Sequence, residues 1–207
     1  MRLTRALLCL SLAVPAAQAG TIVSTLGPGG AFDHYSSWMI GSLFYIHVVT
    51  DTEIATNFTP GADYLLESIS VAVQRLSTMD HPLILHVATG ASYPETILET
   101  LIIPSLPTTA QLETAASVEH PLLQAGTLYW LYLSLDDLKN NLVDWSANTI
   151  GVPGVVVRTI SYDWTYNGMP APAFVVEGTE VVPEPGTLGL SLLGWALVAR
   201  FARSRCR

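Results

Sequence analysis

The sequence predicts an all-β domain of the β-sandwich or jelly-roll kind, with an apolar helix at each end of the chain. Half of the 207 residues are hydrophobic and only 13% are charged, which excludes an intrinsically disordered chain. Much of this apolar excess lies in two terminal segments that are flanked by arginines. Between them, short β-prone runs alternate with turns that contain proline and glycine, and no amphipathic helix of normal length occurs.

The N-terminal segment, residues 1–19, has the features of a secretory signal peptide. Two arginines and then an apolar run occupy residues 1–14. Ala17 and Ala19 are small residues on either side of a single position, as signal peptidase requires, so we expect cleavage before Gly20. We therefore predict an N-terminal signal helix and export of the domain. A short buried helix is the alternative.

The C-terminal segment, residues 181–207, is predicted to contain a single apolar helix. Residues 186–199 are 14 residues without a charge, which is short against the roughly 20 that span a bilayer. Snorkelling arginines and local thinning of the bilayer can accommodate this mismatch. Clustered positive charge favours a cytoplasmic C-terminus, so we expect a transmembrane helix that holds the domain outside the inner membrane. A terminal core helix fits poorly beside the charges of Arg200, Arg203, Arg205 and Arg207.

A short proline-rich motif precedes this helix. It consists of Val182, Pro183, Glu184 and Pro185, and two prolines around a glutamate make an extended segment that cannot be helical. Together with the apolar helix and the arginines, the motif resembles the PEP-CTERM sorting signal of Gram-negative bacteria. The resemblance covers about the last 26 residues. It implies handling by an exosortase, a membrane cysteine protease-transpeptidase that removes the tail, in a bacterium that makes extracellular polysaccharide. Cys206, beyond the usual arginine run, departs from the pattern.

The exported region between the two segments is strongly acidic. Residues 20–182 hold three basic residues, Arg75, Lys139 and Arg158, against 16 of the 17 acidic residues of the chain, so the net charge is near −13. Such a surface repels phosphate backbones, and we expect no nucleic-acid partner. Both cysteines lie in the terminal segments, so the exported region has neither a disulfide nor a thiol nucleophile.

The exported domain, residues 20–180, is predicted to fold from short strands. Polar and apolar residues alternate from Glu67 onward, which is the period of a half-buried strand. Turn clusters such as residues 59–61 and 151–154 separate the runs, and this spacing is typical of a sandwich or jelly roll. The expected strands lie at residues 43–49, 64–74, 83–87, 96–103, 128–135, 155–160 and 174–177.

A second resemblance covers most of this domain. Its parts are residues 24–29, Phe58-Thr59-Pro60, residues 122–131, residues 172–178 and four spaced residues, Trp145, Asn148, Gly151 and Trp164. Together they resemble the choice-of-anchor R domain of exported bacterial proteins. The resemblance implies architecture and surface location but no enzymatic activity. The acidic stretch at residues 136–144 departs from what we expect of that family.

No motif of enzymatic or cofactor chemistry is present. The chain lacks a nucleophile elbow, a P-loop, a dinucleotide fingerprint and a zinc-binding histidine pair, so we expect no catalytic residue, metal or cofactor. Sixteen acidic residues in no order cannot identify a glycosidase pair, and a hydrolase remains only a weak alternative. A cluster of oxygen-bearing side chains departs from EF-hand spacing, and a solvated acidic loop is favoured over a calcium site there: Asp136, Asp137, Asn140, Asn141 and Asp144.

Three alternating aromatic residues are the candidate ligand-binding feature. Tyr162, Trp164 and Tyr166 share one face if they lie on a strand, and aromatic faces stack on the apolar surfaces of sugars. Large aromatics usually serve packing, so a buried row is favoured and a carbohydrate site is the alternative. The strand around Trp130, with Tyr129 and Tyr132, is predicted to be core.

These patterns lead to one functional prediction. We expect a non-enzymatic protein that is exported, anchored transiently in the inner membrane, and then sorted by an exosortase to the cell surface or extracellular matrix. Its expected role is structural or adhesive and linked to extracellular polysaccharide. The main alternative is a carbohydrate-binding module, and a weaker one is a polysaccharide hydrolase.

Overall fold

The domain is all-β, as predicted. The computed structural model describes residues 19–45, 48–78, 81–135, 141–159 and 162–182. Thirteen strands belong to one hydrogen-bonded antiparallel sheet, and a single 3-10 turn, η1 (Pro28–Gly30), is the one helical element of the described residues. Within those ranges no helix is long and apolar enough to cross a membrane. The predicted signal helix and the apolar helix at 186–199 lie outside the described residues.

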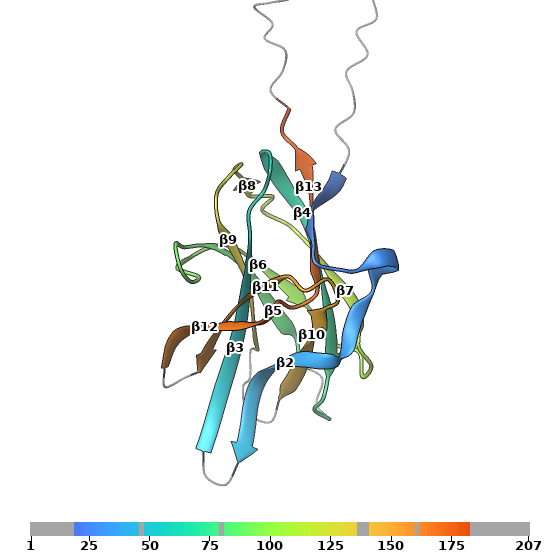
Figure 1. Ribbon diagram of the computed structural model, residues 1–207, viewed down its shortest axis with the longest axis vertical. Helices are drawn as coiled ribbons and strands as arrows, with labels where there is room; N and C mark the ends of the chain where they lie inside the picture. The colour runs from blue at the N-terminus through green and yellow to red at the C-terminus, as the bar shows by residue number, and fades with distance from the viewer. Residues whose placement is uncertain (1–18, 46–47, 79–80, 136–140, 160–161, 183–207) are drawn as a thin grey trace, which may run out of the picture.

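The strands are unequal in length, and the longest ones organise the sheet (Figure 1). Their bounds are β1 (Ala19–Ser24), β2 (Phe32–Tyr45), β3 (Val48–Phe58), β4 (Tyr64–Arg75), β5 (Leu83–Thr89), β6 (Thr96–Ile103), β7 (Gln111–Ala116), β8 (Leu122–Leu123), β9 (Tyr129–Leu135), β10 (Leu142–Asn148), β11 (Pro153–Thr159), β12 (Tyr162–Pro170) and β13 (Phe174–Glu180).

Strand β4 pairs with four other strands. β13 and then β10 pair along one edge of β4, while β8 and then β7 pair along the other edge. The main path of the sheet runs β1-β13-β4-β10-β2-β3-β9-β5-β6. Because β4 forms backbone hydrogen bonds on both edges, it lies in the interior of the sheet. Residues 69–73 of β4 are all buried, so this part of the strand is buried on both faces and not half-buried as its alternation predicts.

Strands β2 and β3 separate from each other part of the way along, and this divergence forms a fork. They pair only from Gly41↔Thr52 to Tyr45↔Val48. Beyond Gly41, β2 pairs with β10, and the edge of β3 that β2 has left pairs with β11. Gly41 has φ +113°, and a side chain there would collide with the carbonyl oxygen of Asn141, so glycine is required at this point.

The main core collects buried side chains from strands throughout the sheet, from β2 to β13. Trp145 and Phe174 are its largest fully buried side chains, and their rings meet edge to face with centroids 6.5 Å apart. The indole N–H of Trp145 donates to the carbonyl oxygen of Ala173 at 3.0 Å. This bond satisfies the one polar atom that the indole carries into the core.

One predicted strand agrees with the structure in its full bounds, although its polar and apolar residues do not alternate. Residues 96–103 were predicted as one strand, and β6 has those bounds. The prediction of a single strand at residues 43–49 is wrong, because Tyr45 pairs with Val48 and the run includes the ends of two paired strands, β2 and β3. An unbroken apolar run does not reveal where a chain reverses direction.

The two ends of the described chain lie side by side. β1 and β13 are antiparallel neighbours, and Ala19 is the partner of Thr179. Thr25 continues this contact, because its hydroxyl donates to Pro172 O at 2.9 Å and accepts from Phe174 N–H at 2.8 Å. Both ends therefore leave the sheet at one pole, at the top of Figure 1, while the β2–β3 hairpin lies at the opposite pole.

Candidate functional site

The predicted processing residues lie at the edges of the described structure. Ala19 and Gly20 are exposed and form the beginning of β1. Val182 is the last described residue and is also exposed. Ala17 and the sorting residues Pro183, Glu184 and Pro185 lie outside the described residues, and so do the four tail arginines.

The predicted aromatic row does not form one uniform surface. Trp164 is half-buried, whereas Tyr166 is 66% exposed. Tyr162 begins β12, and its side chain is outside the described set. Trp164 packs against Tyr132 with ring centroids 6.0 Å apart. Trp164 therefore serves packing, as the favoured interpretation of a buried row predicts. Tyr166 does not fit that interpretation, because its side chain is available to a ligand.

Trp164 belongs to a small outer cluster on the face of the sheet opposite the main core. Its buried members include Trp130 and Tyr132, which confirms the predicted burial of the strand around Trp130. The guanidinium of Arg158 lies 4.9 Å from the ring centroid of Trp164, and it also forms an ion pair with Glu53. Such a stacked cation stabilises the ring in place.

His86 extends the outer cluster along β5. Its ring stacks on Tyr132 with centroids 4.3 Å apart. Nδ1 lies 3.0 Å from the Thr100 hydroxyl, and Nε2 lies 3.0 Å from the Ser134 hydroxyl. Burial lowers the pKa of His86 to about 4. The imidazole is therefore neutral near pH 7, and its two hydroxyl partners fix its orientation.

An open groove lies in the fork between β2 and the β11–β12 hairpin. Its cavity has a volume of about 350 Å³, and none of the described residues that line it is charged. Trp38, a member of the main core, lines it with a nearly buried side chain. Tyr166, which pairs with Val156 and so lies on the face of the outer cluster, is the exposed aromatic residue of the lining. The indole N–H of Trp38 donates to Pro170 O at 2.9 Å, which ties β2 to the end of β12. The lining residues are Trp38, Met39, Thr52, Ile54, Val157, Thr165, Tyr166 and Asn167.

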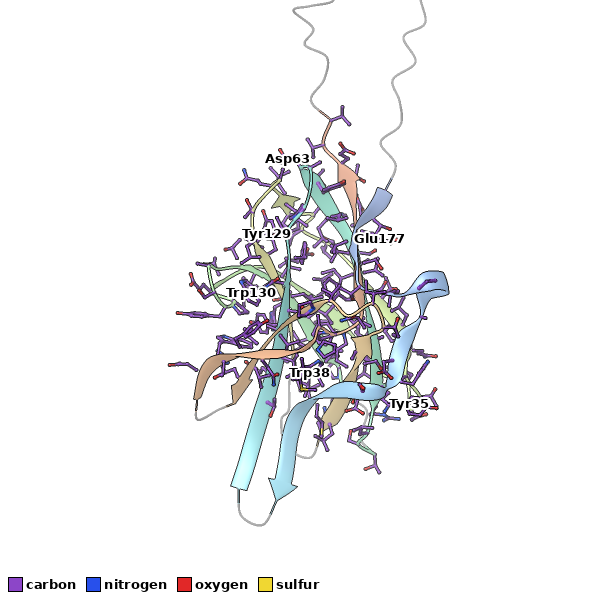
Figure 2. The ribbon with its side chains drawn as sticks, in the orientation of Figure 1. Tyr35, Trp38, Asp63, Tyr129, Trp130 and Glu177 are labelled. Atoms are coloured by element: carbon purple, nitrogen blue, oxygen red, sulfur yellow. The ribbon has the colours of Figure 1, made fainter. Side chains whose placement is uncertain are left out.

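Figure 2 shows Trp38 within the half of the domain that is remote from the chain ends, whereas Asp63 and Glu177 lie in the half near those ends. The groove, which Trp38 lines, therefore lies in the half remote from the pole at which the predicted sorting segment begins. A ligand in the groove would not compete for space with that segment.

A buried carboxylate joins β6 to the loop that follows β7. Glu99 accepts hydrogen bonds from the Ser117 hydroxyl at 2.6 Å, from Val118 N–H at 2.6 Å and from Glu119 N–H at 3.0 Å. Burial by itself would raise the pKa of Glu99, but these hydrogen bonds, with His120 nearby, lower it below its usual value. The carboxylate is thus ionised, and it links β6 to the loop after β7, where no backbone pairing joins β6 and β7 in the described structure.

The described oxygen ligands of the acidic stretch already have protein partners. Asn141 Oδ1 accepts from the Ser77 hydroxyl at 2.9 Å, and Asp144 Oδ2 accepts from the Gln74 amide at 3.1 Å. Asp136, Asp137 and Asn140 lie outside the described residues. Among the described side chains, no group of three or more His, Cys, Asp or Glu residues gathers as a metal site would require.

No protein-family model matches the chain, and no curated protein matches it. The resemblance to PEP-CTERM and choice-of-anchor R proteins thus remains a prediction from the quoted residues. Sequence reasoning identified Tyr166 but missed Trp38, because no local motif marks it. No local signal could have found it, because its place beside Trp145 comes from the pairing of β2 with β10.

Proposed function

We propose that the protein is exported, anchored transiently in the inner membrane of a Gram-negative bacterium, and sorted by an exosortase to the cell surface or extracellular matrix. Signal peptidase acts before Gly20, and the exosortase acts in the segment that contains Pro183, Glu184 and Pro185. The exported domain has a structural or adhesive role linked to extracellular polysaccharide. It is not an enzyme in this proposal, and its acidic surface disfavours nucleic acid.

One observation carries this proposal. Among the described residues, the buried members of the main core lie between Trp38 and Val176, and Ile22 and Val23 pack against them. The ends also emerge together, because Ala19 pairs with Thr179. Cleavage before Gly20 and beyond Val182 would leave these described core residues in one piece, which is what two sequential processing steps require.

Processing is tested by mass spectrometry of the protein from an exosortase-bearing host. We expect a mature N-terminus at Gly20 and loss of the residues through Arg207. The Glu184→Gln variant should accumulate in the inner membrane with its tail uncut. Glu180→Gln, which changes a glutamate of β13 just before the motif, is the matched control and should be processed normally. An exported protein that retains Arg207 would contradict the sorting step.

We also propose that the sheet is a sandwich of the jelly-roll kind. Support comes from the double pairing of β4 and from Glu99, which links β6 to the loop beyond β7. These contacts bring distant parts of one sheet around a common core, as a two-layer fold requires.

Carbohydrate binding is the second candidate function, and the groove favours it. Tyr166 offers an exposed ring beside polar side chains. A glycosidase needs two carboxylates that flank the scissile bond, and no carboxylate is among the described residues that line the groove. Binding is accordingly favoured over hydrolysis at this place.

A further inference from the structure

We propose that the groove between β2 and the β11–β12 hairpin is a binding site for one or two rings of a neutral saccharide, with Tyr166 as the stacking platform. The inference rests on the second proposed function, carbohydrate binding, and names its site and ligand class. It does not depend on whether an exosortase processes the tail.

The fork in the sheet builds the site. Where β2 leaves β3 at Gly41, the free edge of β3 is taken by β11 rather than by β2. The β11–β12 hairpin therefore stands apart from the first half of β2, and a gap remains between them. Its volume of about 350 Å³ falls within the range of small-molecule sites.

The two aromatic walls differ in a way that suits a sugar ring. Trp38 is 9% exposed and is held by its bond to Pro170 O, so it forms a fixed wall. Tyr166 is 66% exposed, and its flat ring presents a negative face to the polarised C–H groups of a pyranose. Ile54 and Val157 add an apolar floor.

Polar groups in the groove can orient hydroxyls. Thr52 and Thr165 contribute hydroxyl groups to the lining. Asn167 uses its side-chain oxygen to accept from Met169 N–H at 3.2 Å, which leaves its amide nitrogen to donate to a ligand. A purely aliphatic ligand would desolvate these groups without pairing them, so a ligand with both apolar and hydroxyl surfaces fits better.

The charge of the site selects against ionic sugars. The described residues that line the groove include neither a cationic side chain for a uronate nor an anionic one for an amino sugar cation. The exported region as a whole is strongly acidic, so an anionic polysaccharide would also be repelled at long range. A neutral hexose polymer is the ligand class that remains.

The test is calorimetric titration of the processed protein, purified from its host, with three probes. These are cellopentaose, laminaripentaose and an oligogalacturonate of equal length, and pull-down on the host's own extracellular polysaccharide is added. We expect binding to a neutral probe or to the neutral fraction of the host polymer, with the oligogalacturonate at least tenfold weaker. Tyr166→Ala should weaken that binding at least tenfold.

The matched control is Tyr93→Ala, which removes another exposed tyrosine that does not line the groove. It should bind as the unaltered protein does. Saccharide binding that survives Tyr166→Ala overturns the groove assignment but leaves carbohydrate binding intact as a function. Absence of binding to every neutral probe and to the host polymer overturns both, and preferred binding of the oligogalacturonate overturns the neutral class. Dimerisation that Tyr166→Ala abolishes would assign the groove to a second copy instead.

Discussion

Two tryptophans that face each other across neighbouring strands have different environments. Trp145 on β10 pairs with Trp38 on β2. The indole of Trp38 donates to the carbonyl of Pro170 at the end of β12, and that of Trp145 donates to the carbonyl of Ala173 just before β13. Trp145 is fully buried in the main core, whereas Trp38 also lines the groove. The closed side of this pair, at Trp145, stabilises the fold, and the open side, at Trp38, contributes to a binding site. The difference arises from the departure of β2 from β3, not from residue type.

The largest predicted effect tests this difference directly. Trp145→Ala should lower the free energy of unfolding by about 4 kcal/mol, because it leaves an enclosed cavity and removes a large buried ring. Trp38→Ala should cost roughly 2 kcal/mol, because the vacated space opens into the groove and admits water. Urea denaturation followed by tyrosine fluorescence or circular dichroism measures both. Equal losses would contradict the distinction between the closed and open sides.

The stability of the domain also depends on the buried carboxylate of Glu99, which links β6 to the loop after β7. Glu99→Ala should cost about 1–3 kcal/mol at pH 7, because it leaves the N–H groups of Val118 and Glu119 without a partner. The folded-state pKa of Glu99 is below its usual value of 4.5, so its stabilisation is complete above that value and is lost as the pH falls through the folded pKa.

The pH dependence of stability distinguishes stabilisation by the ionised Glu99 carboxylate from stabilisation by side-chain packing. Urea midpoints measured from pH 7 to pH 3 should fall less steeply in Glu99→Gln than in the unaltered protein. Glu95→Gln changes an exposed carboxylate near β6 and should preserve the original slope. A Glu99→Gln variant with an unchanged slope would show that Glu99 is not the titrating group.

The outer cluster is expected to contribute a smaller pH dependence of stability, which comes from a histidine and not from a carboxylate. Because the pKa of His86 is about 4 when folded against the usual 6.5, the unfolded chain takes up a proton first as the pH falls. Stability should drop by roughly 1 kcal/mol between pH 7 and pH 5 from this group, since part of the ring keeps contact with water. His86→Gln should remove this component, and His34→Gln, an exposed control, should not.

The smallest predicted effect on stability belongs to the groove itself. Tyr166→Ala removes an exposed side chain and should change the free energy of unfolding by less than about 0.5 kcal/mol. Chemical denaturation beside the binding titration makes the contrast explicit: Trp145 matters for folding, and Tyr166 matters for binding. A Tyr166→Ala variant destabilised by 2 kcal/mol or more would place that residue with the core instead.

The all-β class and the best strands were predictable because the signal is local. The alternation in β4 and the bounded run at β6 can be seen within a dozen residues. β7 was missed because its sequence, QLETAA, is poor in β-branched and aromatic residues. It is a strand because its backbone pairs with β4, which is a tertiary contact.

The candidate site was predictable only in part. The period of two along β12 identified Tyr166 as a candidate ligand residue, but the same period could not separate it from Trp164, which packs on Tyr132. Trp38 joins Tyr166 only through the pairing of β2 with β10 and of β11 with β3. Such long-range registers leave no trace in a local pattern, so the groove emerges only from the folded sheet.

The position of β13 has a mechanical consequence. This strand is hydrogen bonded on one edge to β1 and on the other to β4, and its last residues lead to the segment that would tether the domain. A pull between that tether and a ligand held in the remote half would run nearly along β13. Hydrogen bonds on both edges would then bear the load in shear and would have to break together, whereas a peeled strand loses them one at a time. A domain built this way would resist being drawn out of a matrix by its own anchor.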